Sequence, residues 1–319
     1  MNQKRIIYMG TPPFAVGPLE ALVKAGCDVE AVITAPDRRA GRGLQLRPSA
    51  IKECALRLEL PLLQPVDLRD PVFLEQVRLL KPELMVVVAF RKLPVALWSI
   101  PPLGTINLHA SLLPDYRGAA PINWAIMNGE MKTGVTTFFI QEKIDTGDVL
   151  LQREVAIGPM DTAGELHDHL CAVGAGLLVE SVRGVISGSL SPTSQATMTS
   201  IGALHAAPKL SPAVAEIDWD RSSSQVHDHI RGLSPTPGAW TKYRVNERDS
   251  GTMKILRSAP SPHTGPAVPG TTHVTVGRLL VACRNEWIEI LEVRPEGRRD
   301  MSAADLLNGL RGSSITFGV

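Results

Sequence analysis

Several features are scarce in this 319-residue chain, and each scarcity excludes a class of protein. Aromatic residues make up only 4% of the sequence, and the formal net charge is +1, so bulk charge gives no indication of a nucleic-acid partner. The four cysteines lie far apart, and no CxxC pair or Cys/His cluster has the spacing of metal ligands. We therefore expect no bound metal and buried thiols in a reducing compartment.

Targeting and membrane-spanning segments are also not expected. Residues 1–10 lack the apolar core and cleavage site of a signal peptide. We expect no apolar stretch of the ~20 residues that span a bilayer. The 44% hydrophobic and 20% charged content is typical of a globular chain with one large or two ordinary domains. These features predict a cytoplasmic protein without a membrane partner.

The first 187 residues alternate between strand and helix patterns. An apolar run at residues 5–9 predicts a buried strand, residues 14–25 predict a helix that ends at Gly26, and residues 28–34 predict a second strand. This order predicts a doubly wound, mostly parallel α/β domain over residues 1–187. Further strands are expected at 83–90, 105–109, 134–140 and, at an edge, 149–157, with helices at 49–58, 71–80, 121–127 and 161–186.

The composition changes after residue 187. Residues 188–208 are rich in small polar side chains and predict a linker. Residues 209–319 contain short strand-like segments and a Pro-containing stretch at 258–269 that predicts a loop. We expect a small β-rich domain that could form a barrel, with strands at 270–276, 278–283 and 287–293.

Ligands of open parallel sheets bind beyond the carboxyl ends of the strands, so the residues there are candidates for a site. The first strand is followed by Gly10-Thr11-Pro12-Pro13, which does not match the GxGxxG fingerprint and excludes NAD or FAD binding. Asn107 and His109 end another strand and point the same way because they are two residues apart. They could stabilise an oxyanion, or they could be a polar strand end with a hydrogen-bonded core histidine.

A carboxylate follows the next strand. This segment, Asp145-Thr146-Gly147-Asp148, has two interpretations. It is a simple turn, because Asp and Gly favour turns, or it is a turn that directs the Asp145 carboxylate toward His109. In the second case the carboxylate would orient the imidazole and favour its protonated form.

The combined spacing NxHxSLLPxYRG, followed by DTGD at 145–148, resembles the folate-dependent formyltransferases. The resemblance implies 10-formyltetrahydrofolate as co-substrate and Asn107, His109 and Asp145 as the catalytic trio. Many members have Tyr-Gly where this chain has Phe90-Arg91, which leaves open how that turn holds the folate ring. Strand order and the resemblance together indicate the folate-binding residues Phe90, Arg91, Leu93, Ser111, Leu112, Leu113, Pro114 and Ile140.

A basic loop indicates the acceptor. The segment Pro36-Asp37-Arg38-Arg39-Ala40-Gly41-Arg42-Gly43 is similar to a loop of the family members that formylate methionyl initiator tRNA. In those members the loop enters the acceptor stem, and the arginine matching Arg42 reads the unpaired first position. Residues 37–57 hold six basic and two acidic side chains, a local charge of +4, although a solvated basic loop would look the same. The tRNA-binding residues so implied are Arg38, Arg39, Gly41, Arg42 and Gly43.

The resemblance continues through the C-terminal region, where the family has an OB-like domain that contacts tRNA. Residues 209–319 hold 14 basic and 12 acidic side chains, so their charge of +2 supports that role only weakly. The function indicated is formylation of methionyl initiator tRNA by a monomer. The alternatives are transfer to an amino-sugar nucleotide or glycinamide ribonucleotide, folate hydrolysis by water, and an RNA-binding protein without activity.

Overall fold

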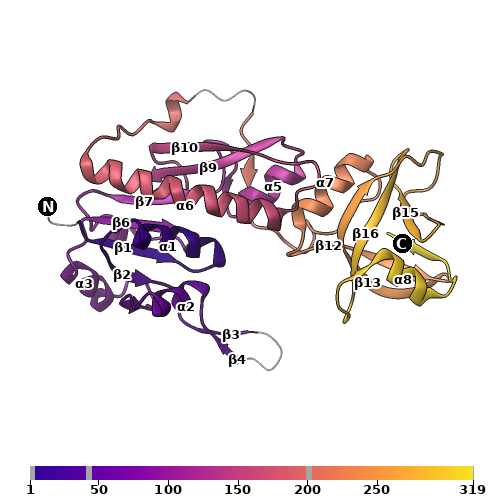
Figure 1. Ribbon diagram of the computed structural model, residues 1–319, viewed down its shortest axis with the longest axis horizontal. Coiled ribbons are helices and arrows are strands. Elements are labelled where there is room, and N and C mark those ends of the chain that lie inside the picture. Colours follow the sequence, from indigo (N-terminus) through magenta and orange to yellow (C-terminus); the bar gives the residue numbers. More distant parts are fainter. Residues whose placement is uncertain (1–3, 41–44, 199–202, 319) are drawn as a thin grey trace. The chain divides into compact units, whose positions relative to one another are not determined.

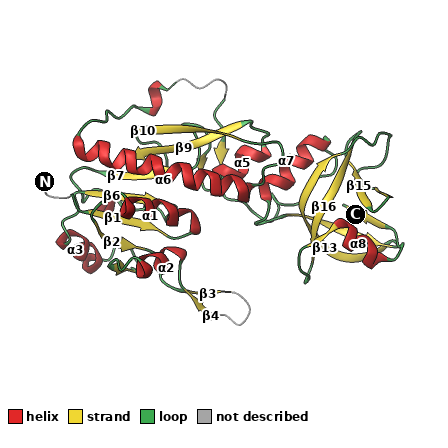
Figure 2. Cartoon of the chain, viewed as in Figure 1, coloured by secondary structure: helices red, strands yellow, loops and turns green. Residues whose placement is uncertain are grey.

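The structure is a computed structural model that describes residues 4–40, 45–198 and 203–318, which form two compact units (Figures 1 and 2). The first unit contains residues 1–118, 133–155 and 167–206, and the second contains 119–132, 156–166 and 207–319. The predicted division into 1–187, 188–208 and 209–319 stays a prediction.

The first unit is built on a seven-stranded sheet whose inner strands are continuous apolar runs. β1 pairs in parallel with β2 and β6, β6 with β7, and β2 with β5, whereas β9 runs antiparallel to β7. The mostly parallel order confirms the predicted fold class, and β10 is at an edge as predicted. In order across the sheet the strands are β10 (Val149–Ala156), β9 (Lys132–Phe139), β7 (Thr105–His109), β6 (Leu84–Val88), β1 (Ile6–Gly10), β2 (Val29–Ile33) and β5 (Leu62–Leu63).

Helices bury the alternating side chains of these strands. Met9 and Val87 lie on one face and pack in a cluster with Phe73 of α3 (Pro71–Leu79). Leu108 lies on the other face, where a Cβ on Gly174 of α6 would be 3.0 Å from its Cδ2. The other described helices before residue 207, of which α5 and the start of α6 belong to the second unit, are η1 (Pro13–Ala15), α1 (Val16–Lys24), α2 (Ala50–Arg57), α4 (Val95–Trp98), α5 (Pro121–Met127), α6 (Ala163–Ser187) and η2 (Gln195–Thr197).

The expectation that no apolar stretch is long enough to span a bilayer is wrong for α6. Among the described residues, this 25-residue helix is long and apolar enough to do so by length and composition. Its side chains Leu166, Leu170, Leu178 and Val182 recur every four or eight residues and are buried, so one face of the helix packs against the protein interior. A helix that packs in a protein core and a helix that spans a bilayer can have the same length and composition, because both environments select apolar residues.

The start of α6 carries a cap whose strength depends on pH. Glu165 Oε2 accepts hydrogen bonds from the backbone N–H and the hydroxyl of Thr162, both at 2.8 Å, and Glu165 also pairs with Arg257. The Thr162 backbone bond, followed by the Arg257 contact, lowers the pKa of Glu165 to about 2.

This lowered pKa predicts a loss of stability in acid. Because the pKa is below its unfolded value of 4.5, the stabilisation by Glu165 is full above that pH and is lost as the pH falls toward about 2. We expect wild type to be more stable than Glu165→Gln near neutral pH, by a small margin because 49% of the Glu165 side chain is exposed. The difference in free energy of unfolding between wild type and Glu165→Gln should shrink as the pH falls from 4.5 to about 2. Denaturant unfolding of both proteins over a pH series measures it, and a constant margin would contradict the assignment.

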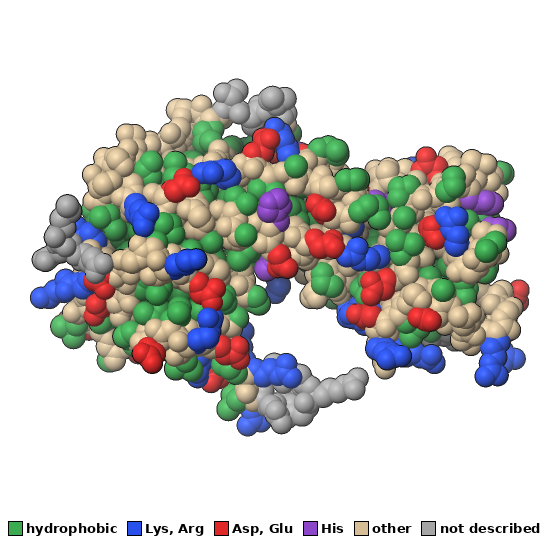
Figure 3. All heavy atoms as spheres, viewed as in Figure 1, with side chains coloured by type: hydrophobic (Ala, Val, Ile, Leu, Met, Phe, Trp, Pro, Cys, Tyr) green, Lys and Arg blue, Asp and Glu red, His purple; other side chains and the backbone are tan. Residues whose placement is uncertain are grey.

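The second unit contains a nearly closed antiparallel barrel. Its sheet order is β14-β15-β16-β13-β12-β18, and the ends meet where Phe317 N donates to Gly270 O at 3.0 Å. On the face drawn in Figure 3 its acidic and basic side chains are interspersed. The strands are β12 (Ala239–Val245), β13 (Arg248–Pro260), β14 (Thr272–Thr275), β15 (Arg278–Ala282), β16 (Trp287–Pro295), β17 (Met301–Ser302), which pairs with β16, and β18 (Ile315–Phe317); β8 (Arg117–Gly118) and β11 (Ala206–Ala207) are two-residue strands elsewhere.

Two helices of this unit were not predicted. α7 (Ser223–Leu233) begins with a capping box between Ser222 and Gln225, and α8 (Ala303–Leu310) packs beside the barrel strands. The predicted loop at 258–269 is wrong in its first three residues, because β13 continues through Pro260 and pairs with β16 there.

Candidate active site

The end of β7 presents Asn107 toward one face of the sheet. Asn107 aligns with Val87 of β6 and Phe138 of β9, so the strand is held on both sides. Its side chain is half-buried, and no hydrogen bond joins its amide to another residue in the described ranges. An amide held at a strand end with free donors is suited to bind a ligand oxygen.

His109, two residues further along the strand, is 7% exposed and has a fixed orientation. Its Nε2 lies 2.9 Å from the backbone carbonyl of Tyr116. A carbonyl only accepts hydrogen bonds, so Nε2 carries the proton. Its Nδ1 lies 3.9 Å from Oδ2 of Asp145, which is too long for a hydrogen bond but within reach of an ion pair. Nδ1 is therefore the ring atom that can exchange a proton.

Asp145 reaches this position through a strained loop after β9. Its φ of 54° is in the left-handed region, which costs a non-glycine residue about 1–2 kcal/mol. Its Oδ2 accepts a 3.0 Å hydrogen bond from the backbone N–H of Gly118. A Cβ on Gly147 would lie 1.6 Å from the Phe139 carbonyl oxygen, so only glycine fits there. The structure thus brings Asp145 to His109, and strained backbone of this kind is common at active sites.

The Ser111-Leu112-Leu113-Pro114 turn is part of the scaffold beneath these residues. The Ser111 hydroxyl donates to Asp115 O at 2.7 Å, and the Leu113 N–H donates to the Thr136 hydroxyl at 3.1 Å. Ser111 and Leu113 are 0% and 1% exposed. Their assignment as folate contacts stays a prediction, and their burial favours a role in shaping the turn; Leu112 and Pro114 are half-buried.

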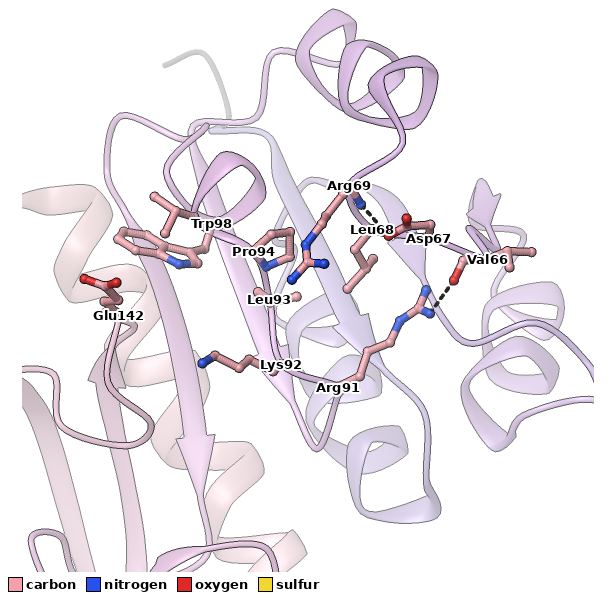
Figure 4. A pocket seen from close by; sticks show the side chains of 11 residues that line it. Val66, Asp67, Leu68, Arg69, Arg91, Lys92, Leu93, Pro94, Trp98 and Glu142 are labelled. Atoms are coloured by element: carbon pink, nitrogen blue, oxygen red, sulfur yellow. Dashed lines mark hydrogen bonds between the residues drawn. The ribbon is translucent and has the colours of Figure 1, made fainter.

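A cavity of about 460 Å³ opens beside the turn after β6 (Figure 4). Arg91 crosses that turn and donates to the carbonyls of Val66, at 2.8 Å, and Pro65. Burial lowers the pKa of Arg91, and nearby Arg38 lowers it further. Arg91 and Leu93 of the predicted folate set line this cavity; none of the catalytic trio does. The lining residues are Val66, Asp67, Leu68, Arg69, Arg91, Lys92, Leu93, Pro94, Val95, Trp98 and Glu142.

Phe90 and Ile140 complete the predicted folate set. Both are half-buried and pack against the apolar cluster that contains Leu93. The guanidinium of Arg91 lies 5.5 Å from the centre of the Phe90 ring. The Phe90-Arg91 pair in this turn is thus held by a ring contact and by hydrogen bonds to two carbonyls.

Comparison with known proteins accounts for both units. Residues 4–182 match the formyl transferase family, and residues 209–311 match the formyl transferase C-terminal domain. The methionyl-tRNA formyltransferase of Flavobacterium johnsoniae is 44% identical over 314 residues, which cover 97% of each chain. That of Bacteroides thetaiotaomicron is 44% identical over 309 residues, 96% of each chain. The chain belongs to the methionyl-tRNA formyltransferase family.

Solved structures share the fold of this methionyl-tRNA formyltransferase family member. An N-formyltransferase from Helicobacter canadensis, in complex with folinic acid and dTDP-3-aminofucose, matches with a TM-score of 0.66 at 18% identity and covers 90% of this chain and 98% of its own. HypX from Aquifex aeolicus in complex with tetrahydrofolic acid matches with a TM-score of 0.62 at 17% identity over 98% of this chain and 48% of its own. At such identities the likeness supports the fold alone.

The described part of the basic segment suggested for tRNA by the family resemblance lies in a two-stranded sheet. β3 (Arg38–Ala40) pairs antiparallel with β4 (Gln45–Arg47), and Arg38 and Arg39 are exposed. Its base is anchored by Asp37, which accepts hydrogen bonds from Lys52 at 2.7 Å and Gln64 at 2.9 Å. The Lys52 contact lowers the pKa of Asp37. Gly41, Arg42 and Gly43 lie outside the described residues.

Gln195 contacts the candidate site, although none of the methionyl-tRNA formyltransferase motifs in the sequence includes it. It lies in the segment predicted as a linker, yet its side chain is 5% exposed and bonded to the Asp145 loop. One glutamine among small polar residues carries no periodic pattern, so nothing in the sequence distinguished it.

Proposed function

We propose that this protein transfers the formyl group of 10-formyltetrahydrofolate to the α-amino group of methionyl initiator tRNA, which gives the formylmethionyl-tRNA that starts translation. The observation that carries the proposal is near-full-length similarity to methionyl-tRNA formyltransferases, in a chain that places an imidazole and a carboxylate 3.9 Å apart beside Asn107. The proposal includes action as a monomer in the cytoplasm.

The reaction forms one C–N bond and breaks another. The amine attacks the formyl carbon on N10 of the folate, and the oxygen of the tetrahedral intermediate gains negative charge. Asn107 donates a hydrogen bond to that oxygen, and protonated His109 assists from Nδ1, because its Nε2–H is engaged by Tyr116. Asp145 holds the imidazolium and passes on the proton that the amine loses. Collapse then breaks the bond to N10, which takes up a proton.

The co-substrate is a folate rather than a resident cofactor. Phe90, Leu93 and Ile140 provide apolar surface for its pteridine ring, with backbone groups at the ring edge. The adjoining cavity is lined by three cations, of Arg69, Arg91 and Lys92, and by two carboxylates, so a net positive charge faces the carboxylates at the other end of a folate. This arrangement needs no metal.

The acceptor is tested by comparing amines. We expect labelled formyl groups to move from 10-formyltetrahydrofolate to methionyl initiator tRNA and much less to charged elongator tRNA. Transfer to an amino-sugar nucleotide at a higher rate would identify a small-molecule formyltransferase. Release of free formate without an acceptor would identify a hydrolase, and either result would overturn the proposal.

The basic segment at residues 36–43 predicts a separate effect on tRNA. Arg42→Ala is expected to raise the KM for methionyl initiator tRNA and to leave folate affinity unchanged, because the side chain is proposed to contact the acceptor stem. Steady-state kinetics and equilibrium binding of a folate measure the two effects. Equal losses for tRNA and folate would mean that Arg42 supports the structure instead.

A further inference from the structure

Gln195 begins the short helix η2 (Gln195–Thr197), and its segment is fastened to the main sheet. Thr193 and Val149 exchange two backbone hydrogen bonds of 2.8 Å, which pin the chain just before Gln195. A buried polar side chain needs partners, because an unmet donor or acceptor costs the desolvation of that group.

The amide of Gln195 uses its full hydrogen-bonding capacity. Its Nε2 donates to the carbonyls of Asp145 at 3.0 Å and Gly147 at 2.7 Å. Its Oε1 accepts from Arg117 Nε at 3.1 Å and from Arg117 Nη2 at 2.6 Å. Two donors and two lone pairs are all that a primary amide has.

These bonds reach both sides of the contact that orients Asp145. On one side they hold the backbone of the loop at Asp145, which has a left-handed φ, and at Gly147. On the other side they hold Arg117, the residue before Gly118, whose N–H binds the Asp145 carboxylate at 3.0 Å. One side chain therefore braces the donor and the acceptor of that hydrogen bond.

We propose that Gln195 is a positioning residue for formyl transfer, which keeps the Asp145 carboxylate opposite His109 without touching the reacting atoms. This inference rests on the proposed function, because Gln195 acts through Asp145. It also requires a neutral amide. A glutamate would place an acceptor oxygen against two carbonyl oxygens, and a methionine would keep the length and lose all four bonds.

The first test uses Gln195→Met and Gln195→Glu, with Gln76→Glu as the matched control on the exposed face of α3. Single-turnover formyl transfer is measured over a pH series beside thermal unfolding and folate affinity. We expect Gln195→Met to be about 10²-fold slower at unchanged folate affinity, the loss typical of a catalytic group displaced by ~1 Å. Gln195→Glu should be as slow near neutral pH, and its rate relative to wild type at the same pH should rise in acid, where protonation of the new carboxyl restores one donor. Gln76→Glu should behave as wild type.

A double-mutant cycle tests the route through Asp145. If Gln195 only positions Asp145, adding Gln195→Met to Asp145→Asn should cost little further rate. Independent losses that multiply, or a Gln195→Met variant with the turnover and pH profile of wild type, would overturn the inference. Wild-type turnover in Asp145→Asn would refute the role of Asp145, whereas absence of formyl transfer in the wild-type protein would refute the proposed function. Should Gln195→Met fail to fold, Gln195→Glu decides, since it retains an acceptor for Arg117.

Discussion

Replacing Asn107 with alanine is expected to lower the rate of formyl transfer by about 10²–10³, the usual cost of removing one oxyanion donor. The amide is placed at the end of an inner strand, and no described residue competes for its donors. Its hydrogen bond strengthens as charge develops on the formyl oxygen, so the loss should fall on kcat more than on KM. Single-turnover kinetics at saturating folate and tRNA measure it.

The matched control for Asn107→Ala is Gln76→Ala, which removes an exposed amide from α3. It should leave the rate unchanged. Asn107→Ala should keep its thermal midpoint and folate affinity, because the amide makes no hydrogen bond to another described residue. A variant that folds, binds folate and transfers formyl groups at the wild-type rate would remove Asn107 from the mechanism.

Gly147→Ala is the second change with a large expected effect, about 10²-fold on turnover. The new Cβ would lie 1.6 Å from the Phe139 carbonyl, so the loop must move, and with it the Asp145 carboxylate. The 3.9 Å approach to His109 and the bond to Gly118 depend on that loop. The loss should therefore appear in kcat, while the apolar folate surface stays intact.

Gly176→Ala controls for the substitution itself. Gly176 lies on the exposed side of α6, and a Cβ there meets no atom within 4 Å. Alanine favours a helix over glycine by about 1 kcal/mol, so this variant should be slightly more stable and fully active. If Gly147→Ala were equally active, the tight return of the loop onto β9 would have no part in catalysis.

The α/β region was predictable because its elements carry strong local patterns. β1 and β6 are uninterrupted apolar runs, as buried parallel strands require. α5 has the predicted bounds, since Pro121 fits the first turn of a helix. The turn residues that follow the strands were therefore placed correctly, and with them the approach of Asp145 to His109.

The second unit was less predictable because its elements depend on tertiary contacts. α7 has a capping box and buried residues such as Val226 and Ile230, but it lies between turn-rich segments that made the region look strand-like. The prediction of a loop at Pro260 is wrong because proline is accepted at the end of a strand such as β13. Neither outcome follows from local propensity alone.

Within the candidate site, sequence patterns indicated the proposed catalytic residues but not the residues that hold them in place. The bond of Gly118 to Asp145 and the four bonds of Gln195 join segments far apart in the chain. Such contacts have no period and no fixed spacing, so only the folded chain reveals them.

The most direct test of the central claim is the single-turnover rate of the triple variant Asn107→Ala/His109→Ala/Asp145→Ala, compared with the three single variants. Residues that act as one unit lose their effects together. We predict that the triple variant loses about as much as the most damaging single change. Three independent losses that multiply, or single variants that keep the wild-type rate, would contradict a concerted action of amide, imidazole and carboxylate on the formyl carbon.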